Sequence, residues 1–183
     1  MDDFGCVTGR LQPMHLDHLD LFRTVLARHE HLIVAVTNPD PTARIAHPQH
    51  DSRHLGDDNP FTYYERQAFV RAALVADGIA SGRFEIVPFP LHSADLVEQY
   101  VPLGVTQYVR VFAPWEESKA EMLRSYGYHV VVLPGDAAAR RSGRDVRAAL
   151  RSASEWRHLL PRSVATGVEQ SLALKPLSER TGP

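Results

Sequence analysis

The chain has 183 residues, of which 44% are hydrophobic and 23% charged, a length that suits one well-buried core and is short for two domains. A formal net charge of −2 removes any global electrostatic case for binding nucleic acid or a membrane surface. No apolar run approaches the roughly 20 residues needed to cross a bilayer, and the single Cys6 excludes an intrachain disulfide. We therefore expect one soluble, cytoplasmic domain over residues 1–175, with 176–183 a frayed tail. The oligomeric state is left open, a homo-oligomer included.

Short β-rich runs alternate with amphipathic stretches along the chain, which predicts a parallel sheet with helices on both faces. The order begins with a strand over residues 4–8, a helix whose apolar positions follow helical spacing over 19–26, and a fully buried strand over 31–37. Residues 38–58 are rich in Pro, His, Asp and Arg, and their length predicts a mobile loop.

A capping box formed by Thr62 and Glu65 predicts the start of the next helix, and Gly78 its end. The elements expected after it are a strand over 84–89, a short helix after Ser93, a strand over 107–112, a helix over 115–126, a strand over 128–133, a helix capped by Ser142 and Asp145, and a mainly helical stretch from 155 to 175. This pattern predicts a single-domain α/β fold with a doubly wound five-stranded parallel sheet and C-terminal helices. Ligands on such sheets bind outside the carboxyl ends of the strands.

Two histidines follow the first predicted strand, where residues 9–18 read G-R-L-Q-P-M-H-L-D-H. His15 and His18 lie at the start of a helix, whose free N–H groups and positive dipole end would stabilise a phosphate chain together with the two imidazoles. A metal pair or two incidental surface histidines would also explain this spacing. No set of Cys or acidic ligands at suitable spacing supports zinc.

A cluster of arginines follows the fifth predicted strand. On a helix that begins after Ser142, the side chains of Arg144, Arg147 and Arg151 share one face and repel one another unless an anion or carboxylates lie against them. A solvated basic face is the common alternative. The cluster lies at the same sheet edge as the two histidines, which favours an anion site.

Three ordered segments resemble the motifs of the HxGH nucleotidylyltransferases. Residues 9–18 resemble G-R-F-Q-P-x-H-x-G-H, residues 142–147 (S-G-R-D-V-R) resemble I-S-x-T-x-x-R, and residues 59–66 (N-P-F-T-Y-Y-E-R) resemble the N-P-F-T-x-x-E-R of archaeal-type nicotinamide mononucleotide (NMN) adenylyltransferases. The resemblance covers residues 4–161, nearly the whole chain. It implies sheet order 3-2-1-4-5, a nucleoside triphosphate (CTP or ATP), Mg²⁺, and nucleotidyl transfer to a small anionic acceptor with release of pyrophosphate.

The resemblance also implies roles for individual residues. His15, His18 and Arg147 would contact the triphosphate and stabilise the leaving pyrophosphate. The residues expected to bind the nucleotide are Thr8, Gly9, Arg10, Gln12, Asp17, Ser142 and Arg144. We expect Arg110, Asn59 and Arg53 to bind the acceptor, and we assign no side chain as a metal ligand.

Several side chains keep two interpretations. Arg110, in an otherwise apolar strand, could bind the acceptor anion or form a structural salt bridge. Trp115 and Trp156 could stack on a base, although aromatic residues at helix ends more often belong to the core. The loop residues His47, His50, Arg53 and His54 could form a lid over the acceptor or a solvated loop.

Two residues depart from the family pattern, which has Gly at the position of Asp17 and Thr at that of Arg144. Asp17 could accept from a ribose hydroxyl or an exocyclic amine, or merely cap the helix. The long loop, the turn at 37–41 and residues 111–116 resemble the cytidylyltransferases of phosphonate pathways. This likeness favours transfer from CTP to a small phosphonate or phosphate. The alternatives are NMN adenylyl transfer from ATP and a catalytically weak nucleotide-binding regulator.

Overall fold

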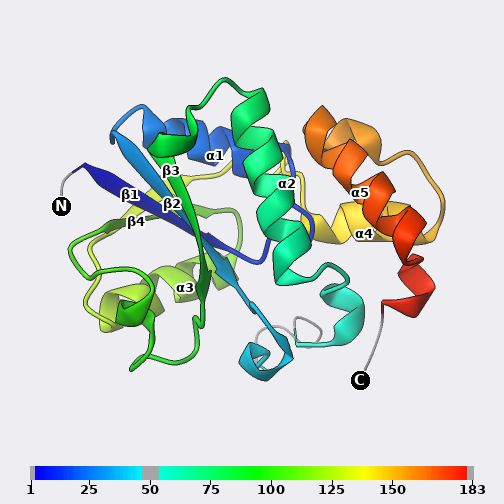
Figure 1. Ribbon diagram of the computed structural model, residues 1–183. Helices are drawn as coiled ribbons and strands as arrows, with labels where there is room; N and C mark the ends of the chain where they lie inside the picture. Colours follow the sequence, from blue (N-terminus) through cyan, green and yellow to red (C-terminus); the bar gives the residue numbers. More distant parts are fainter. Residues whose placement is uncertain (1–2, 47–53, 181–183) are drawn as a thin grey trace.

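The computed structural model describes residues 3–46 and 54–180. Its strands are β1 (Phe4–Gly9), β2 (His31–Thr37), β3 (Phe84–Phe89), β4 (Thr106–Val111) and β5 (Val130–Pro134). They pair in parallel in the order β3-β2-β1-β4-β5, which confirms the predicted doubly wound sheet (Figure 1). The chain reverses its direction of travel across the sheet between β1 and β4, so the crevice for a ligand lies at the carboxyl ends of these strands.

Helices cover both faces of the sheet (Figure 1). They are α1 (Leu16–Leu26), α2 (Tyr63–Ala76), α3 (Pro114–Ser125), α4 (Gly143–Arg151) and α5 (Arg162–Leu174). Successive strand residues point to opposite faces. In β1, Val7 packs in the core shared with α1, α2, α4 and α5, whereas Cys6 packs in the core shared with α3. Cys6 is therefore a core residue, and burial raises the pKa of its thiol to about 12.

The segment after β3 differs from the expectation of a short helix. It contains the single 3₁₀ turn η4 (Val97–Gln99). Val97, Val101 and Val105 of this segment are at most 1% exposed and pack against the α3 face of the sheet. Burial of these three apolar side chains holds the segment in place. Pro102, between Val101 and Val105 in the sequence, disfavours a longer helix.

The predicted long loop is described at its two ends, and residues 47–53 lie outside the described part. It carries the 3₁₀ turns η1 (Pro41–Ala43) and η2 (Gly56–Asp58). Asp58 pairs with Arg147 of α4 at 2.9 Å, and Arg151 donates to the carbonyl of Asp57. The end of this loop is therefore packed against the arginine face of α4.

Residues 176–180, which the sequence places in the tail, are part of the described structure. These residues form the 3₁₀ turn η6 (Leu177–Glu179), and the side chain of Arg180 is 4% exposed and pairs with Glu65. Arg180 is held in place because its guanidinium bonds a carboxylate and backbone carbonyls. The composition of the tail did not reveal these contacts. Residues 181–183 lie outside the described part.

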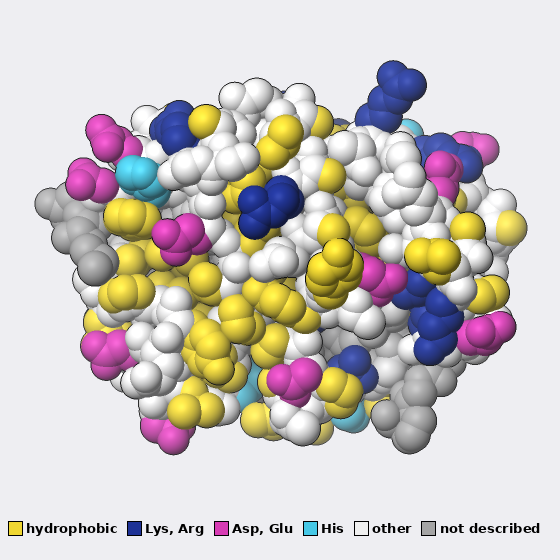
Figure 2. Space-filling view, in the orientation of Figure 1, with side chains coloured by type: hydrophobic (Ala, Val, Ile, Leu, Met, Phe, Trp, Pro, Cys, Tyr) yellow, Lys and Arg dark blue, Asp and Glu magenta, His cyan; other side chains and the backbone are white. Residues whose placement is uncertain are grey.

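The surface agrees with the nearly balanced charge of the chain. Figure 2 shows Lys and Arg side chains interspersed with Asp and Glu on the described part of the face drawn, without an extended area of one sign. Within residues 3–46 and 54–180, no helix is long and apolar enough to cross a membrane.

Candidate active site

A cavity of about 640 Å³ opens at the carboxyl ends of β1 and β4, between the N-termini of α1 and α4, a size typical of small-molecule sites. The cationic side chains among the described residues that line it are Arg10, Arg110, Lys119, Arg140, Arg141, Arg144 and Arg147. The carboxylates among them are Asp17, Asp58, Glu116 and Asp145. The lining is therefore net positive, although the whole chain is slightly negative, and it suits an anionic ligand.

His15 and His18 lie side by side in this cavity, with ring centroids 3.8 Å apart. His15 is the N-cap residue of α1 and is 7% exposed. Its backbone N–H donates to Nδ1 of His18 at 3.2 Å. Because Nδ1 of His18 accepts, the proton of the neutral ring is on Nε2. This Nε2 would be 3.7 Å from a Cβ at Gly9, so it faces the end of β1.

Both histidines are neutral donors in the free protein. Burial, reinforced by Arg140, Arg141 and Arg147, lowers the pKa of His15 from 6.5 to about 3. Burial and the neighbouring His15 hold the pKa of His18 well below its usual range. Nδ1 of His15 is buried without a hydrogen-bond partner. A buried polar atom in a cationic pocket indicates a ligand that completes the site.

The pKa of His15 leads to a prediction about stability and pH. Between pH 6.5 and about 3 the unfolded chain binds a proton that the folded chain does not, so stability falls as the pH falls below 6.5, by roughly 1.4 kcal/mol per pH unit for this group. We expect His15→Asn to flatten the slope of unfolding free energy against pH by about this amount, measured by urea unfolding between pH 6 and 4.5. The exposed His158 gives the control. Equal slopes in the parent, His15→Asn and His158→Asn would contradict the prediction.

The arginine helix α4 begins as predicted. Ser142 Oγ accepts from the backbone N–H of Asp145 at 3.3 Å, and the Asp145 carboxylate accepts from Ser142 N at 3.1 Å. Arg147 is buried, and its Nη1 donates to the carbonyl of Gln12 at 2.8 Å. A Cβ at Gly143 would lie 3.1 Å from both partners of this bond. The small residue therefore lets the helix start against the loop that follows β1.

Asp17 has a partner that the sequence did not predict. Its carboxylate accepts from the backbone N–H of Arg141 at 2.8 Å and from the Arg141 guanidinium at 3.1 Å. The N-cap of α1 is His15, so Asp17 does not cap the helix. Asp17 lines the cavity and joins α1 to the loop before α4. Its contact with the nucleoside stays a prediction, and such a contact would share a carboxylate already bonded to Arg141.

Arg66, in the segment 59–66, contacts the loops around the cavity. Arg66 is 1% exposed, and its guanidinium donates at 2.8 Å to the carbonyls of Arg10 and Thr37. A further bond of 2.8 Å reaches the carbonyl of Asn38. Burial lowers the pKa of Arg66 to about 10, so it stays a cation at neutral pH. Arg66 thus ties the loops after β1 and β2 together.

The structure brings together all but two of the predicted site residues. Thr8, Gly9, Arg10, Gln12, Asp17, Ser142, Arg144 and Arg110 line the cavity with the two histidines and Arg147. Arg110 donates to the carbonyl of Asp17 at 3.5 Å and to Thr24 Oγ1 at 3.4 Å, so neither of these partners is a carboxylate. Asn59 is buried, donates to the carbonyl of Leu55 and is not among the lining residues, which does not support an acceptor role. Arg53, with His47 and His50, lies outside the described residues.

Sequence reasoning missed Lys119, which is a member of the cavity wall. Lys119 of α3 donates from Nζ to the carbonyl of Thr8 at 3.0 Å. Arg140 pairs with Glu116 at 2.8 Å. The short connection from β4 to α3 could have indicated that α3 contributes to the site, because the start of that helix lies at the same sheet edge. Trp115 is 7% exposed, and it belongs both to the α3 core and to the cavity wall. Trp156 is a core residue.

The carboxylates in the wall are already bonded to the protein: Asp17 to Arg141, Asp58 to Arg147, Glu116 to Arg140, and Asp145 to Ser142. Within the described residues, no group of three or more His, Cys, Asp or Glu side chains could hold a metal ion. Mg²⁺ usually keeps several waters and binds largely through substrate phosphates. A divalent ion at this site would therefore depend on the phosphates of a bound nucleotide for most of its ligands.

Comparison with known proteins identifies two groups of relatives. The chain is 32% identical over 166 residues to phosphonoformate cytidylyltransferase of Streptomyces viridochromogenes. The aligned region covers 91% of this chain and 90% of that protein. It is 27% identical over 167 residues to the nicotinamide-nucleotide adenylyltransferase of Thermococcus sibiricus, covering 91% and 83%. No protein-family model matches the chain.

A solved structure has the same fold. The bifunctional NMN adenylyltransferase/ADP ribose pyrophosphatase of Francisella tularensis aligns with a TM-score of 0.67 and 12% identity, over 97% of this chain and 52% of that one. The present chain thus spans about half the length of that enzyme. The same enzyme has been solved in complex with AMP and a manganese ion.

Proposed function

The chain belongs to the nucleotidylyltransferases, in the family of phosphonoformate cytidylyltransferase, and from this premise we propose that it transfers the cytidylyl group of CTP to a small phosphonate or phosphate and releases pyrophosphate. The observation that carries the proposal is the convergence of His15, His18, Arg147 and the capped N-terminus of α4 on one positively charged cavity. The relative that is 32% identical is a phosphonoformate cytidylyltransferase, which supports CTP and a phosphonate as the substrates.

The proposed reaction needs no protein nucleophile. An anionic oxygen of the acceptor attacks the α-phosphorus in line, the bond from that phosphorus to the bridging oxygen breaks, and pyrophosphate leaves with the electron pair. Nε2–H of His18 and the ring of His15 would donate to oxygens on which negative charge increases, and Arg147 would hold the terminal phosphates. Arg110 and Lys119 are the cations we assign to the acceptor side, on β4 and α3 respectively.

We propose Mg²⁺ as the companion of the triphosphate. Bound to the phosphates, it would neutralise part of their charge and make the leaving group more stable. The manganese complex of the Francisella tularensis enzyme supports a divalent ion.

Base choice gives a testable prediction. Asp17, bonded to Arg141, lies in the cavity wall at the position where the H-x-G-H motif has Gly. A pyrimidine needs less room than a purine, so we expect CTP to exceed ATP by at least about 10-fold in kcat/KM, or roughly 1.4 kcal/mol. Asp17→Gly should reduce this ratio. Asp20→Gly places glycine in the same helix outside the cavity lining and should keep it.

The outcomes of this comparison are distinct. If Asp17→Gly lowers both values of kcat/KM equally, Asp17 serves only to dock the loop that carries Arg141. If the parent prefers ATP, the wall does not select the base, and the prediction is wrong.

NMN adenylyl transfer from ATP is the second candidate. The N-P-F-T-Y-Y-E-R segment and the 27% identity to the Thermococcus sibiricus enzyme favour it. Both candidates use the same phosphate site and the same leaving group, so they differ only in the base and the acceptor.

A pyrophosphate-release panel tests the proposal by crossing CTP and ATP with phosphonoformate, other small phosphonates and NMN. We expect the highest kcat/KM for CTP with a phosphonate. The pair of ATP and NMN as the best substrates would establish the second candidate. Absence of pyrophosphate from every pair would contradict both and favour a nucleotide-binding regulator.

A further inference from the structure

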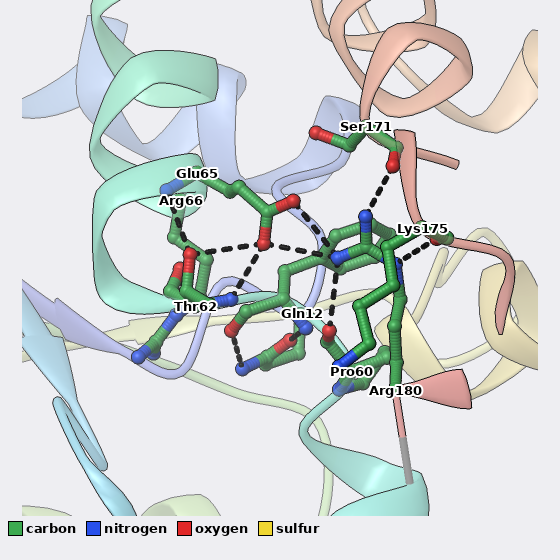
Figure 3. Close-up of polar contacts among 9 residues, drawn as sticks. Gln12, Pro60, Thr62, Glu65, Arg66, Ser171, Lys175 and Arg180 are labelled. Atoms are coloured by element: carbon green, nitrogen blue, oxygen red, sulfur yellow. Dashed lines mark hydrogen bonds and ion pairs between the residues drawn. The ribbon is translucent and has the colours of Figure 1, made fainter. Parts of the chain in front are cut away.

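Arg180 lies just beyond η6 and joins the end of the described chain to α2 and α5 (Figure 3). Its Nη1 donates to both oxygens of the Glu65 carboxylate, at 2.8 and 3.1 Å, and to the carbonyl of Pro60 at 3.3 Å. Nη2 donates to the carbonyl of Ser171, and Nε to that of Lys175. A guanidinium that is 4% exposed and bonded through all its nitrogens is held in one geometry.

Phe61 is held both at its ring and at its backbone. The Arg180 guanidinium lies over the Phe61 ring, 5.5 Å from its centroid. The side-chain amide of Gln12 also bonds the Phe61 backbone twice: Nε2 donates to the carbonyl at 2.8 Å, and Oε1 accepts from the amide at 2.9 Å. Phe61 is 1% and Gln12 3% exposed. Residues 59–62 are therefore fixed between the tail and the loop that follows β1.

The same segment leads to the phosphate side of the cavity. The carbonyl of Gln12 accepts from Nη1 of Arg147 at 2.8 Å. Asp58, at the start of the segment, pairs with Nη2 of Arg147 at 2.9 Å. Both nitrogens at the end of the Arg147 side chain are thus placed by groups whose positions depend on residues 59–62.

We infer that Arg180 is a positioning residue for the triphosphate side of the site: by fixing residues 59–62 it fixes Gln12, and through Gln12 it fixes Arg147. Arg180, Glu65 and Phe61 are not among the residues that line the cavity, so Arg180 acts through others. The inference rests on the proposed function, because the position of Arg147 matters to turnover only if the cavity holds a triphosphate. A shift of Arg147 by a fraction of an ångström would weaken binding of the triphosphate, because a site of this kind depends on the alignment of the groups that bind the phosphates.

The test measures the geometry and the kinetics in the same variants. In Arg180→Ala we expect hydrogen exchange of the Phe61 amide, followed by NMR, to be at least about 10-fold faster, because its bond to Gln12 opens more often. We also expect KM for the nucleotide to rise about 10-fold, with a smaller change in kcat. Arg180→Lys keeps a charge near Glu65 but cannot reach all the carbonyls, so it should be intermediate.

Arg157 provides a matched control. It pairs with Glu169 of α5 and lies 5.1 Å from the centroid of the Trp156 ring, and its side chain is 60% exposed. Arg157→Ala therefore removes an ion pair to α5 and a contact with the adjacent Trp156 ring, and it leaves residues 59–62 untouched. We expect it to leave Phe61 exchange and the nucleotide KM at the parent values.

Two results would overturn the inference. One is exchange at Phe61 that stays at the parent rate in Arg180→Ala. The other is faster exchange with parent values of KM and kcat, which would make Arg180 a purely structural residue. A parent protein that turns over no substrate would instead contradict the proposed function. In that case the exchange rate of Phe61 would still decide whether Arg180 fixes the segment.

Discussion

His18→Ala is expected to lower kcat by at least about 100-fold with the fold intact, because it removes an N–H donor aimed at charge that increases in the transition state. The donor is Nε2, since Nδ1 of His18 accepts from the backbone of His15. His15→Ala is expected to have an effect of the same order, because the centroid of its ring lies 3.8 Å from that of His18 in the same wall. Both are measured as pyrophosphate release at saturating nucleotide.

A conservative variant separates catalysis from packing. His18→Gln can place an amide N–H near the position of Nε2 and should recover part of the lost kcat, whereas alanine cannot. Melting temperatures check that each variant is folded. Turnover near the parent value in both His15→Ala and His18→Ala would contradict the assignment of this wall to the phosphates.

Arg147→Ala is expected to lower kcat/KM for the nucleotide by about 100-fold, or roughly 2.7 kcal/mol, mostly through KM. Arg147 is 2% exposed, and its guanidinium is the charge that we assign to the terminal phosphates. The measurement is the dependence of initial rate on nucleotide concentration at saturating acceptor.

Loss of Arg147 also leaves Asp58 without its ion-pair partner, so the single variant should be less stable. The double variant Arg147→Ala, Asp58→Ala removes both charges and should recover stability without recovering KM. Recovery of KM together with stability would show that Arg147 acts on folding alone. An unchanged KM in the single variant would show that α4 does not bind the nucleotide.

The fold could be predicted because its signals are local. Strands over 31–37 and 84–89 and the helix starts at Thr62 and Ser142 follow from apolar runs and capping boxes, which depend on neighbouring residues. The short helix expected after Ser93 is instead the 3₁₀ turn η4, in a segment whose apolar side chains pack on the sheet.

The site could be predicted only in part. The motif segments predicted the histidines and Arg147 as site residues, and the rule for parallel sheets predicted that they lie at one edge, where they line one cavity. Pairs between distant residues were missed, including Asp17 with Arg141, Lys119 with Thr8, and Arg180 with Glu65. A charged residue gives no local sign of its partner when that partner is tens of residues away. Only the folded chain reveals such pairs.

The fate of labelled phosphorus tests the central claim most directly. The protein is incubated with a phosphonate acceptor and CTP labelled at either the α- or the γ-phosphorus, and the products are separated. Attack at the α-phosphorus without a protein nucleophile predicts that α-label appears only in the acceptor product and γ-label only in pyrophosphate. Label on the protein, or γ-label in inorganic phosphate formed directly from CTP, would contradict the account.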